Sequence, residues 1–152
     1  MHDMVKILFI CHGNICRSPM AEFIFKDLVR QAGLERRFEI ASAATSREEI
    51  GNDMYPPAKR CLRAHGVPFS PRAARQVTPR DYDDWDLLII MDDLNRRNLN
   101  RILPDDPEGK VHTLLSYTGR DAVIPDPWYT DDFESAYRDI LRGCKALFEA
   151  VT

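Results

Sequence analysis

The chain has 152 residues, a length that favours one domain with a well-buried core. Its 44% hydrophobic and 30% charged residues are typical of a soluble protein, and its net charge of −3 gives no overall positive field for nucleic acid or an anionic membrane. The first residues carry no basic segment followed by a long apolar run, so we expect a cytoplasmic protein without a membrane segment.

Short apolar runs alternate with segments of helical spacing along the chain. The apolar runs at residues 5–10, 38–42, 87–91 and 110–114 predict strands, and the first is apolar enough for the centre of a sheet. Helical spacing predicts helices over 20–33, 56–66, 92–103 and 133–151, with His65 and Leu94 among the residues facing the core. This alternation predicts a single α/β domain over residues 1–152, built on a parallel sheet with helices on both faces.

One segment between the first predicted strand and the first predicted helix combines an attacking atom with a fixed positive charge. It consists of Cys11, His12, Gly13, Asn14, Ile15, Cys16, Arg17 and Ser18. A curled loop at such a position directs backbone N–H groups inward, and the N-terminus of the following helix adds partial positive charge. The segment therefore predicts a phosphate-binding loop with a nucleophile beside it.

The residue types in this loop suit the transfer of a phosphoryl group. Cysteine attacks as a thiolate, and both a helix N-terminus and the charge of Arg17 favour that form of Cys11. Arginine also presents a planar fork that matches two phosphate oxygens. Ser18 can donate a hydrogen bond to the sulfur, and the amide of Asn14 can hold the loop. We expect the phosphoryl group to pass to Cys11 and then to water.

Such a reaction needs a proton donor for the leaving oxygen and then a base for the attacking water. Asp126 is the candidate, because two prolines hold its backbone and Trp128 and Tyr129 follow it in a long connection. Two simpler interpretations stay open: Asp126 can be a turn residue, and the two aromatic residues can form a surface lid or a partner patch. We expect Asp92 to be a helix cap outside the chemistry.

A zinc site is an alternative interpretation of the cysteines and histidines. The spacings Cys11-x4-Cys16 and Cys61-x3-His65 offer four ligands, and His12 offers a fifth. Against this site, Cys61 and His65 have the spacing of core-facing residues, and the arginine of the loop would repel a cation. We therefore expect no metal.

The segments CHGNICRSPMAE at 11–22 and DPWY at 126–129 resemble those of the low-molecular-weight protein tyrosine phosphatases, and the similarity extends over nearly the whole chain. The resemblance implies a four-stranded parallel sheet of Rossmann-like or flavodoxin-like topology and a phosphatase without metal or cofactor. It also implies a phosphotyrosine-containing protein as partner, such as a tyrosine kinase, and a monomer or weak homodimer.

The resemblance further implies roles for individual residues. The catalytic residues would be the nucleophile Cys11, the phosphate ligand Arg17, and Asp126 as acid and then base. The residues supporting the loop would be Asn14, Ser18 and Ser42. Cys16 would be a redox partner that forms a reversible, protective disulfide with the nucleophile, and inert packing of Cys16 stays open as the alternative.

Three positions depart from the pattern of that family. Glu48 stands where an aromatic residue usually lines the substrate cleft, so Trp128 and Tyr129 would form most of its aromatic wall. This predicts weaker stacking on phosphotyrosine and some repulsion of acidic peptides. Arg72 stands where a histidine commonly supports the loop, which leaves part of the loop network open, and Ala44 replaces a glycine.

Three other activities compete with phosphotyrosine hydrolysis. Arsenate reductases of the same architecture resemble the chain in the loop, but they use a further cysteine pair, and residues 77–90 contain no cysteine. Protein arginine phosphatases tend to carry threonine at the position of Ile15, whose apolar side chain favours an aryl ester. A non-catalytic module that binds phosphorylated ligands is disfavoured, because Cys11, Arg17 and Asp126 are all present.

Overall fold

The computed structural model describes residues 4–152, which form a four-stranded parallel sheet with strand order β2-β1-β3-β4. The strands are β1 (Val5–Cys11), β2 (Phe38–Ala44), β3 (Leu87–Ile90) and β4 (Val111–Thr113). The α-helices are α1 (Arg17–Gln31), α2 (Pro56–Ala64), α3 (Asp81–Asp84), α4 (Asp93–Leu99), α5 (Pro127–Thr130) and α6 (Phe133–Val151). The predicted α/β fold is confirmed.

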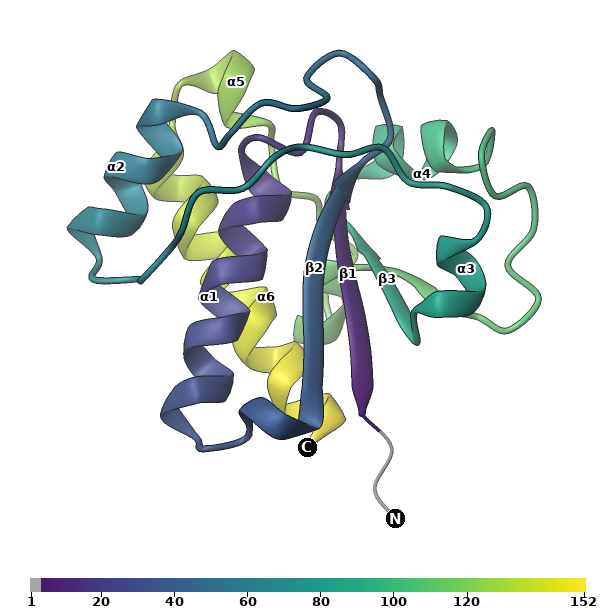
Figure 1. The fold of residues 1–152 in the computed structure, drawn as a ribbon, viewed down its shortest axis with the longest axis horizontal. Helices are drawn as coiled ribbons and strands as arrows, with labels where there is room; N and C mark the ends of the chain where they lie inside the picture. The colour runs from purple at the N-terminus through teal and green to yellow at the C-terminus, as the bar shows by residue number, and fades with distance from the viewer. Residues whose placement is uncertain (1–3) are drawn as a thin grey trace.

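β1 lies in the interior of the sheet because its side chains are apolar on both faces. Ile7 and Phe9 belong to the core formed with α1, α2 and α6, whereas Leu8 and Ile10 belong to a second core on the side of α3 and α4. All four side chains are fully buried. Figure 1 shows α1, α2 and α6 on one side of the sheet and α3 and α4 on the other. The prediction of helices on both faces is therefore confirmed.

Two residues that were expected to face the core lie at the surface. Leu94 is 50% exposed, because the inward face of α4 is formed instead by Asn95 and Leu99, four residues apart. The side-chain oxygen of the buried Asn95 accepts a hydrogen bond from the backbone N–H of Met91 at 3.0 Å, whereas its Nδ2 atom has no partner within residues 4–152. His65 follows the last residue of α2 and is exposed, so its expected core-facing position is wrong.

The strands of the sheet run in parallel, so their carboxyl ends meet at one edge, where ligands bind in folds of this kind. At that edge in Figure 1 lie the loop that follows β1, the connection after β2, and the short helix α5. In the described part of the chain, no helix combines the length and apolar character needed to cross a bilayer.

The connection between α2 and α3 is held against β2 by a polar cluster around Asp81. Gln76 forms a parallel bridge with Ala44 at the end of β2. The adjacent Arg75 donates both guanidinium nitrogens to the Asp81 carboxylate at 3.0 and 3.1 Å, and the backbone N–H of Thr78 donates to it at 2.8 Å. Burial alone would raise the pKa of Asp81, but these hydrogen bonds outweigh it and hold that pKa below its usual range.

We expect Asp81→Asn to lower the free energy of unfolding by about 1–3 kcal/mol at pH 7, because it removes a charged acceptor from a buried cluster. Since the folded-state pKa of Asp81 is depressed, this stability is present above the unfolded value of about 3.9 and is lost as pH falls through the folded value. Urea denaturation at pH 7 and at about pH 3 measures both effects. Asp83→Asn, at an exposed position of α3, is the matched control. A stability difference between wild type and Asp81→Asn that is as large at pH 3 as at pH 7 would contradict the assignment.

Candidate active site

The loop after β1 turns directly into α1. β1 ends at Cys11 and α1 begins at Arg17, and Asn14 between them has a left-handed φ of 60°, which asparagine adopts more readily than most residues. The N-cap residue of α1, Cys16, makes no side-chain hydrogen bond to the first turn of the helix. The partial positive charge of this helix end favours an anion beside the loop.

The Cys11 sulfur receives hydrogen bonds from the first turn of α1. The Ser18 hydroxyl oxygen lies 3.0 Å from the sulfur, and the Ser18 backbone N–H donates to the same sulfur at 3.4 Å. The side-chain amide of Asn14 donates to the Ser18 hydroxyl oxygen at 2.8 Å. The Ser18 hydroxyl has two acceptors within reach, the sulfur at 3.0 Å and the backbone oxygen of Ala43 at 3.5 Å. A proton directed at the nearer sulfur stabilises negative charge there.

Asn14 connects the loop to the neighbouring strand β2. Its amide nitrogen also donates to the Ser42 hydroxyl at 2.9 Å, and Ser42 in turn donates to the carboxylate of Glu22 at 2.6 Å. Asn14 and Ser18 are fully buried, and Ser42 is 8% exposed. The structure thus places the three residues predicted to support the loop in one continuous chain of hydrogen bonds.

Arg72 fills the position that the sequence left open in this network. Its Nη2 atom donates to the backbone oxygen of Asn14 and to the side-chain oxygen of Asn14, both at 2.6 Å. The backbone N–H of Arg75 adds a longer bond to the same side-chain oxygen at 3.3 Å. A guanidinium therefore fixes the orientation of the Asn14 amide, so that its NH2 group faces the two serine hydroxyls.

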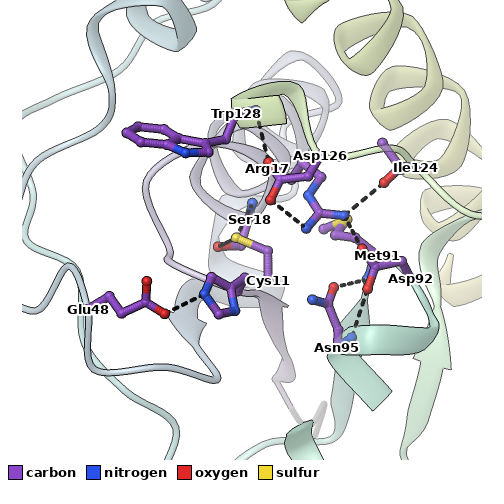
Figure 2. Close-up of polar contacts among 11 residues, drawn as sticks. Cys11, Arg17, Ser18, Glu48, Met91, Asp92, Asn95, Ile124, Asp126 and Trp128 are labelled. Atoms are coloured by element: carbon purple, nitrogen blue, oxygen red, sulfur yellow. Dashed lines mark hydrogen bonds and ion pairs between the residues drawn. The ribbon is translucent and has the colours of Figure 1, made fainter. Parts of the chain in front are cut away.

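Arg17 is held by three acceptors from distant parts of the chain, as Figure 2 shows. Its Nη1 atom donates to Asp92 at 2.6 Å and to the backbone oxygen of Ile124 at 2.8 Å. Its Nη2 atom lies 3.4 Å from a carboxylate oxygen of Asp126. Burial alone would lower the pKa of Arg17, but Cys11, Asp126 and Asp92 together raise it above its usual value, so the guanidinium keeps its charge.

One nitrogen of this buried guanidinium has no partner within residues 4–152. The Arg17 side chain is only 2% exposed, and its Nε atom is inaccessible to solvent. This nitrogen makes no hydrogen bond to any described residue. A buried donor without an acceptor costs about 1–3 kcal/mol, so an oxyanion that accepts from Nε would recover this loss. The two terminal nitrogens of Arg17 thus lie beside protein acceptors, and Nε is left for a ligand.

Asp126 has both properties that the sequence left as alternatives. It is the N-cap of α5, where its carboxylate accepts from the backbone N–H of Trp128 at 3.0 Å, and its other oxygen faces Arg17. Asp126 and Cys11 also line the same cavity. The turn interpretation and the position required of a proton donor are therefore compatible.

The cavity at the loop has a volume of about 90 Å³. Its walls are formed by Cys11, His12, Gly13, Ile15, Cys16, Glu48, Glu49, Asp126, Trp128 and Tyr129. Trp128 is braced by Tyr55, with ring centroids 4.7 Å apart, whereas Tyr129 is 80% exposed. The opposite wall carries Glu48, whose carboxylate lies 2.7 Å from Nε2 of His12. The structure thus places one aromatic and one acidic wall at the cavity.

Cys16 differs from the other cysteine of the loop in its environment. Burial raises the pKa of the Cys16 thiol far above its ordinary range, and the nearby Cys11 contributes a smaller part of this rise. Cys16 is therefore a neutral thiol near pH 7. Its role as a redox partner stays a prediction.

The four-ligand zinc set considered from the sequence does not assemble. Within residues 4–152, the ligand atoms of Cys61 and His65 lie close together with those of Glu134 and not with those of Cys11 or Cys16.

Sequence reasoning placed Asp92 outside the site and left the contribution of Arg72 open, and the structure shows that both residues position the site. Asp92 is a helix cap as expected, with one oxygen accepting from the Asn95 backbone N–H at 2.7 Å, but its other oxygen binds Arg17. Its place directly after the buried strand β3, at the same sheet edge as the loop, was the available signal. The contact of Arg72 with Asn14 spans 58 positions of sequence, and no local pattern indicates it.

Comparison with known proteins covers the whole domain. The sequence model described as low molecular weight phosphotyrosine protein phosphatase matches residues 6–152. The low molecular weight protein-tyrosine-phosphatase YfkJ of Bacillus subtilis is 39% identical over 150 residues, which cover 97% of this chain and 96% of that protein. The low molecular weight phosphotyrosine protein phosphatase of Homo sapiens is 39% identical over 149 residues, which cover 95% and 94%.

Solved structures of phosphatases are also similar to this chain over nearly its whole length. The crystal structure of YfkJ from Bacillus subtilis superposes with a TM-score of 0.93 at 38% identity, covering 98% of this chain and 95% of that one. The crystal structure of DARP, a Drosophila arginine phosphatase, has a TM-score of 0.87 at 30% identity, with coverage of 97% and 98%. Fold, loop and sequence agree over nearly the full length, and the chain belongs to the low molecular weight phosphotyrosine protein phosphatase family.

Proposed function

We propose that the chain hydrolyses phosphotyrosine monoesters in proteins through a cysteinyl-phosphate intermediate. The observation that carries this proposal is the buried Nε of Arg17, which has no partner among the described residues while Asp92 and Ile124 fix the other side of the guanidinium. A phosphate oxygen accepting from Nε would satisfy this donor, and the backbone N–H groups of the loop between β1 and α1 would bind the other oxygens. The substrate phosphorus would then lie next to the Cys11 sulfur.

The proposed reaction has two steps. In the first, the Cys11 thiolate attacks phosphorus, the bond from phosphorus to the phenolic oxygen breaks, and Asp126 transfers its proton to that oxygen. In the second, Asp126 accepts a proton from water, water oxygen attacks phosphorus, and the phosphorus–sulfur bond breaks. Phosphate leaves and the thiolate returns, stabilised by the hydroxyl of Ser18 at 3.0 Å. Arg17 stabilises the charge on the phosphoryl oxygens in both steps.

An aryl ester suits the walls of the cavity. Ile15 and Trp128 both line it, and they offer apolar surface to a phenyl ring. Phosphoarginine is the second candidate substrate, because DARP, named an arginine phosphatase, superposes over 97% of this chain. The apolar side chain of Ile15 offers no hydrogen bond to a guanidinium-linked phosphate, which favours the aryl ester.

The test compares the two substrates directly. Phosphate release is measured from a phosphotyrosine peptide and from a phosphoarginine peptide of the same sequence, in the presence of a chelator. We expect a higher kcat/KM for phosphotyrosine and inhibition by vanadate. A higher kcat/KM for phosphoarginine would assign the chain to that substrate, and arsenate reduction coupled to thioredoxin without release of phosphate would overturn both.

We expect Glu48→Trp to lower KM for p-nitrophenyl phosphate by about 2- to 10-fold, because an added ring can stack on the substrate for about 0.5–1.5 kcal/mol. Glu48→Gln is the control: it removes the negative charge and the ion pair with His12 but adds no ring. The difference between the two variants is therefore the effect of the ring. Steady-state kinetics of the three proteins, with acidic and basic peptides as second substrates, measure both contributions. If KM is unchanged or rises in Glu48→Trp, the cavity does not stack the ring against this wall.

A further inference from the structure

A second cluster of reactive side chains lies where α2 meets the first turn of α6. Cys61 and His65 are four residues apart, at the last turn of α2 and just after it, so they share one face. Glu134 is the second residue of α6. The three ligand atoms, one sulfur, one imidazole nitrogen and one carboxylate oxygen, all lie within 4.8 Å of one another.

The distances in this cluster are close to those of a tetrahedral metal centre. Zinc binds sulfur at about 2.3 Å and carboxylate oxygen or imidazole nitrogen at about 2.0–2.1 Å, which separates sulfur from oxygen by about 3.5 Å. The sulfur of Cys61 lies 3.7 Å from the carboxylate oxygen of Glu134. Nε2 of His65 lies 2.6 Å from the same oxygen, a hydrogen bond that must lengthen by less than 1 Å in the metal-bound form. The Glu134 side chain is 54% exposed and is free to make this adjustment.

We propose that Cys61, His65 and Glu134 bind one zinc ion, with water as the fourth ligand, and that the ion joins α2 to α6. The ligand types are those that zinc prefers, and a thiolate with a carboxylate balances its two positive charges. In the metal-free form His65 pairs with Glu134, and the Cys61 thiol donates to the backbone oxygen of Phe133 at 3.5 Å and to Glu134 at 3.7 Å. Exposed ion pairs and thiol hydrogen bonds of this kind stabilise little. On loss of its proton, the Cys61 sulfur would exchange these weak hydrogen bonds for a bond to the metal.

The neighbouring residues orient the cluster and leave it accessible. The ring of His65 stacks on Tyr137 of α6, with centroids 3.8 Å apart and planes 11° from parallel, which fixes the plane of the imidazole. Cys61 is 7% exposed, whereas the His65 side chain is 32% exposed, so an ion can enter from solvent. Burial and Glu134 raise the pKa of the Cys61 thiol to about 11, so binding must release the thiol proton to solvent.

The zinc site lies outside the catalytic cavity but is connected to its wall through packed aromatic rings. Phe133, which precedes Glu134, packs on Tyr55 with ring centroids 6.1 Å apart, and Tyr55 packs on Trp128 in the cavity wall. An ion between α2 and α6 would therefore hold together the two helices behind that wall. The proposal does not depend on the reaction at Cys11.

The test uses a protein in which zinc cannot bind at the catalytic loop. In a Cys11→Ser/Cys16→Ser background freed of metal by a chelator, titration calorimetry with zinc should give one ion per chain with a dissociation constant of about 1 μM or lower. Repeating the titration in two buffers of different ionisation enthalpy should show proton release. Cobalt bound in place of zinc should give a thiolate-to-metal charge-transfer band in the near ultraviolet.

Single substitutions in this background locate the site. Cys61→Ser should abolish the charge-transfer band, and Cys61→Ser and Glu134→Gln should each weaken zinc binding by at least about tenfold. Cys144→Ala and Asp139→Asn, in the same helix as Glu134, should leave the band and the affinity unchanged. Zinc should also raise the Tm of the background protein and not that of Cys61→Ser. The absence of stoichiometric binding, or binding that survives Cys61→Ser, would overturn the proposal.

Discussion

Cys11→Ser is expected to reduce the hydrolysis of p-nitrophenyl phosphate by at least about 10⁴-fold, because a serine hydroxyl stays protonated where a thiol ionises. The substitution changes one atom at the end of β1 and leaves its hydrogen-bond partners in place. The hydroxyl of Ser18 can bond to oxygen as it does to sulfur, and the network through Asn14 and Arg72 stays intact. The loss should therefore fall on kcat, with phosphate binding retained.

Two measurements separate this chemical effect from a structural one. Calorimetric titration with phosphate should give an affinity for Cys11→Ser within a few-fold of the wild type, since Arg17 and the N-terminus of α1 are unchanged. Cys144→Ala, which removes a buried thiol of α6, should keep most of its activity. Turnover by Cys11→Ser within tenfold of the wild type would remove the sulfur from the mechanism.

The fold could be predicted because its elements carry local signals. β1 is apolar on both faces, α6 repeats its buried residues at three and four, and both patterns survive in the structure. The predicted boundaries of the elements were less accurate. The strand predicted over 38–42 continues to Ala44, and the helix predicted over 92–103 ends at Leu99. Short helices of four residues, such as α5, have too few positions to show a period.

The catalytic loop could be predicted because its chemistry lies within eight consecutive residues. The groups that orient it could not, because they come together only when the chain folds. Asp92 lies 75 positions from Arg17, and its local pattern was already explained by the cap of α4. Arg72 was recognised only as a departure from a histidine, and its two bonds to Asn14 depend on how residues 72–76 run beside β2.

Asp126→Asn is expected to lower kcat by about 10²- to 10⁴-fold for phenyl phosphate, whose leaving oxygen needs a proton. Asparagine is a suitable test because its side-chain oxygen can still accept from the N–H of Trp128, so the N-cap of α5 is kept. The loss of a negative charge 3.4 Å from Arg17 leaves that guanidinium bound to Asp92 and Ile124. The fold and the phosphate site should therefore be preserved.

The choice of leaving group distinguishes a proton donor from a structural cap. p-Nitrophenolate leaves readily without a proton, so the first step with p-nitrophenyl phosphate should suffer much less from Asp126→Asn than the first step with phenyl phosphate. Pre-steady-state measurement of phenol release isolates this step from the hydrolysis of the cysteinyl-phosphate. Asp131→Asn, at the C-terminal end of α5, is the control and should change neither rate. An equal loss for both leaving groups would mean that Asp126 acts through Arg17 or the helix cap, and a loss below about threefold would exclude it as the acid.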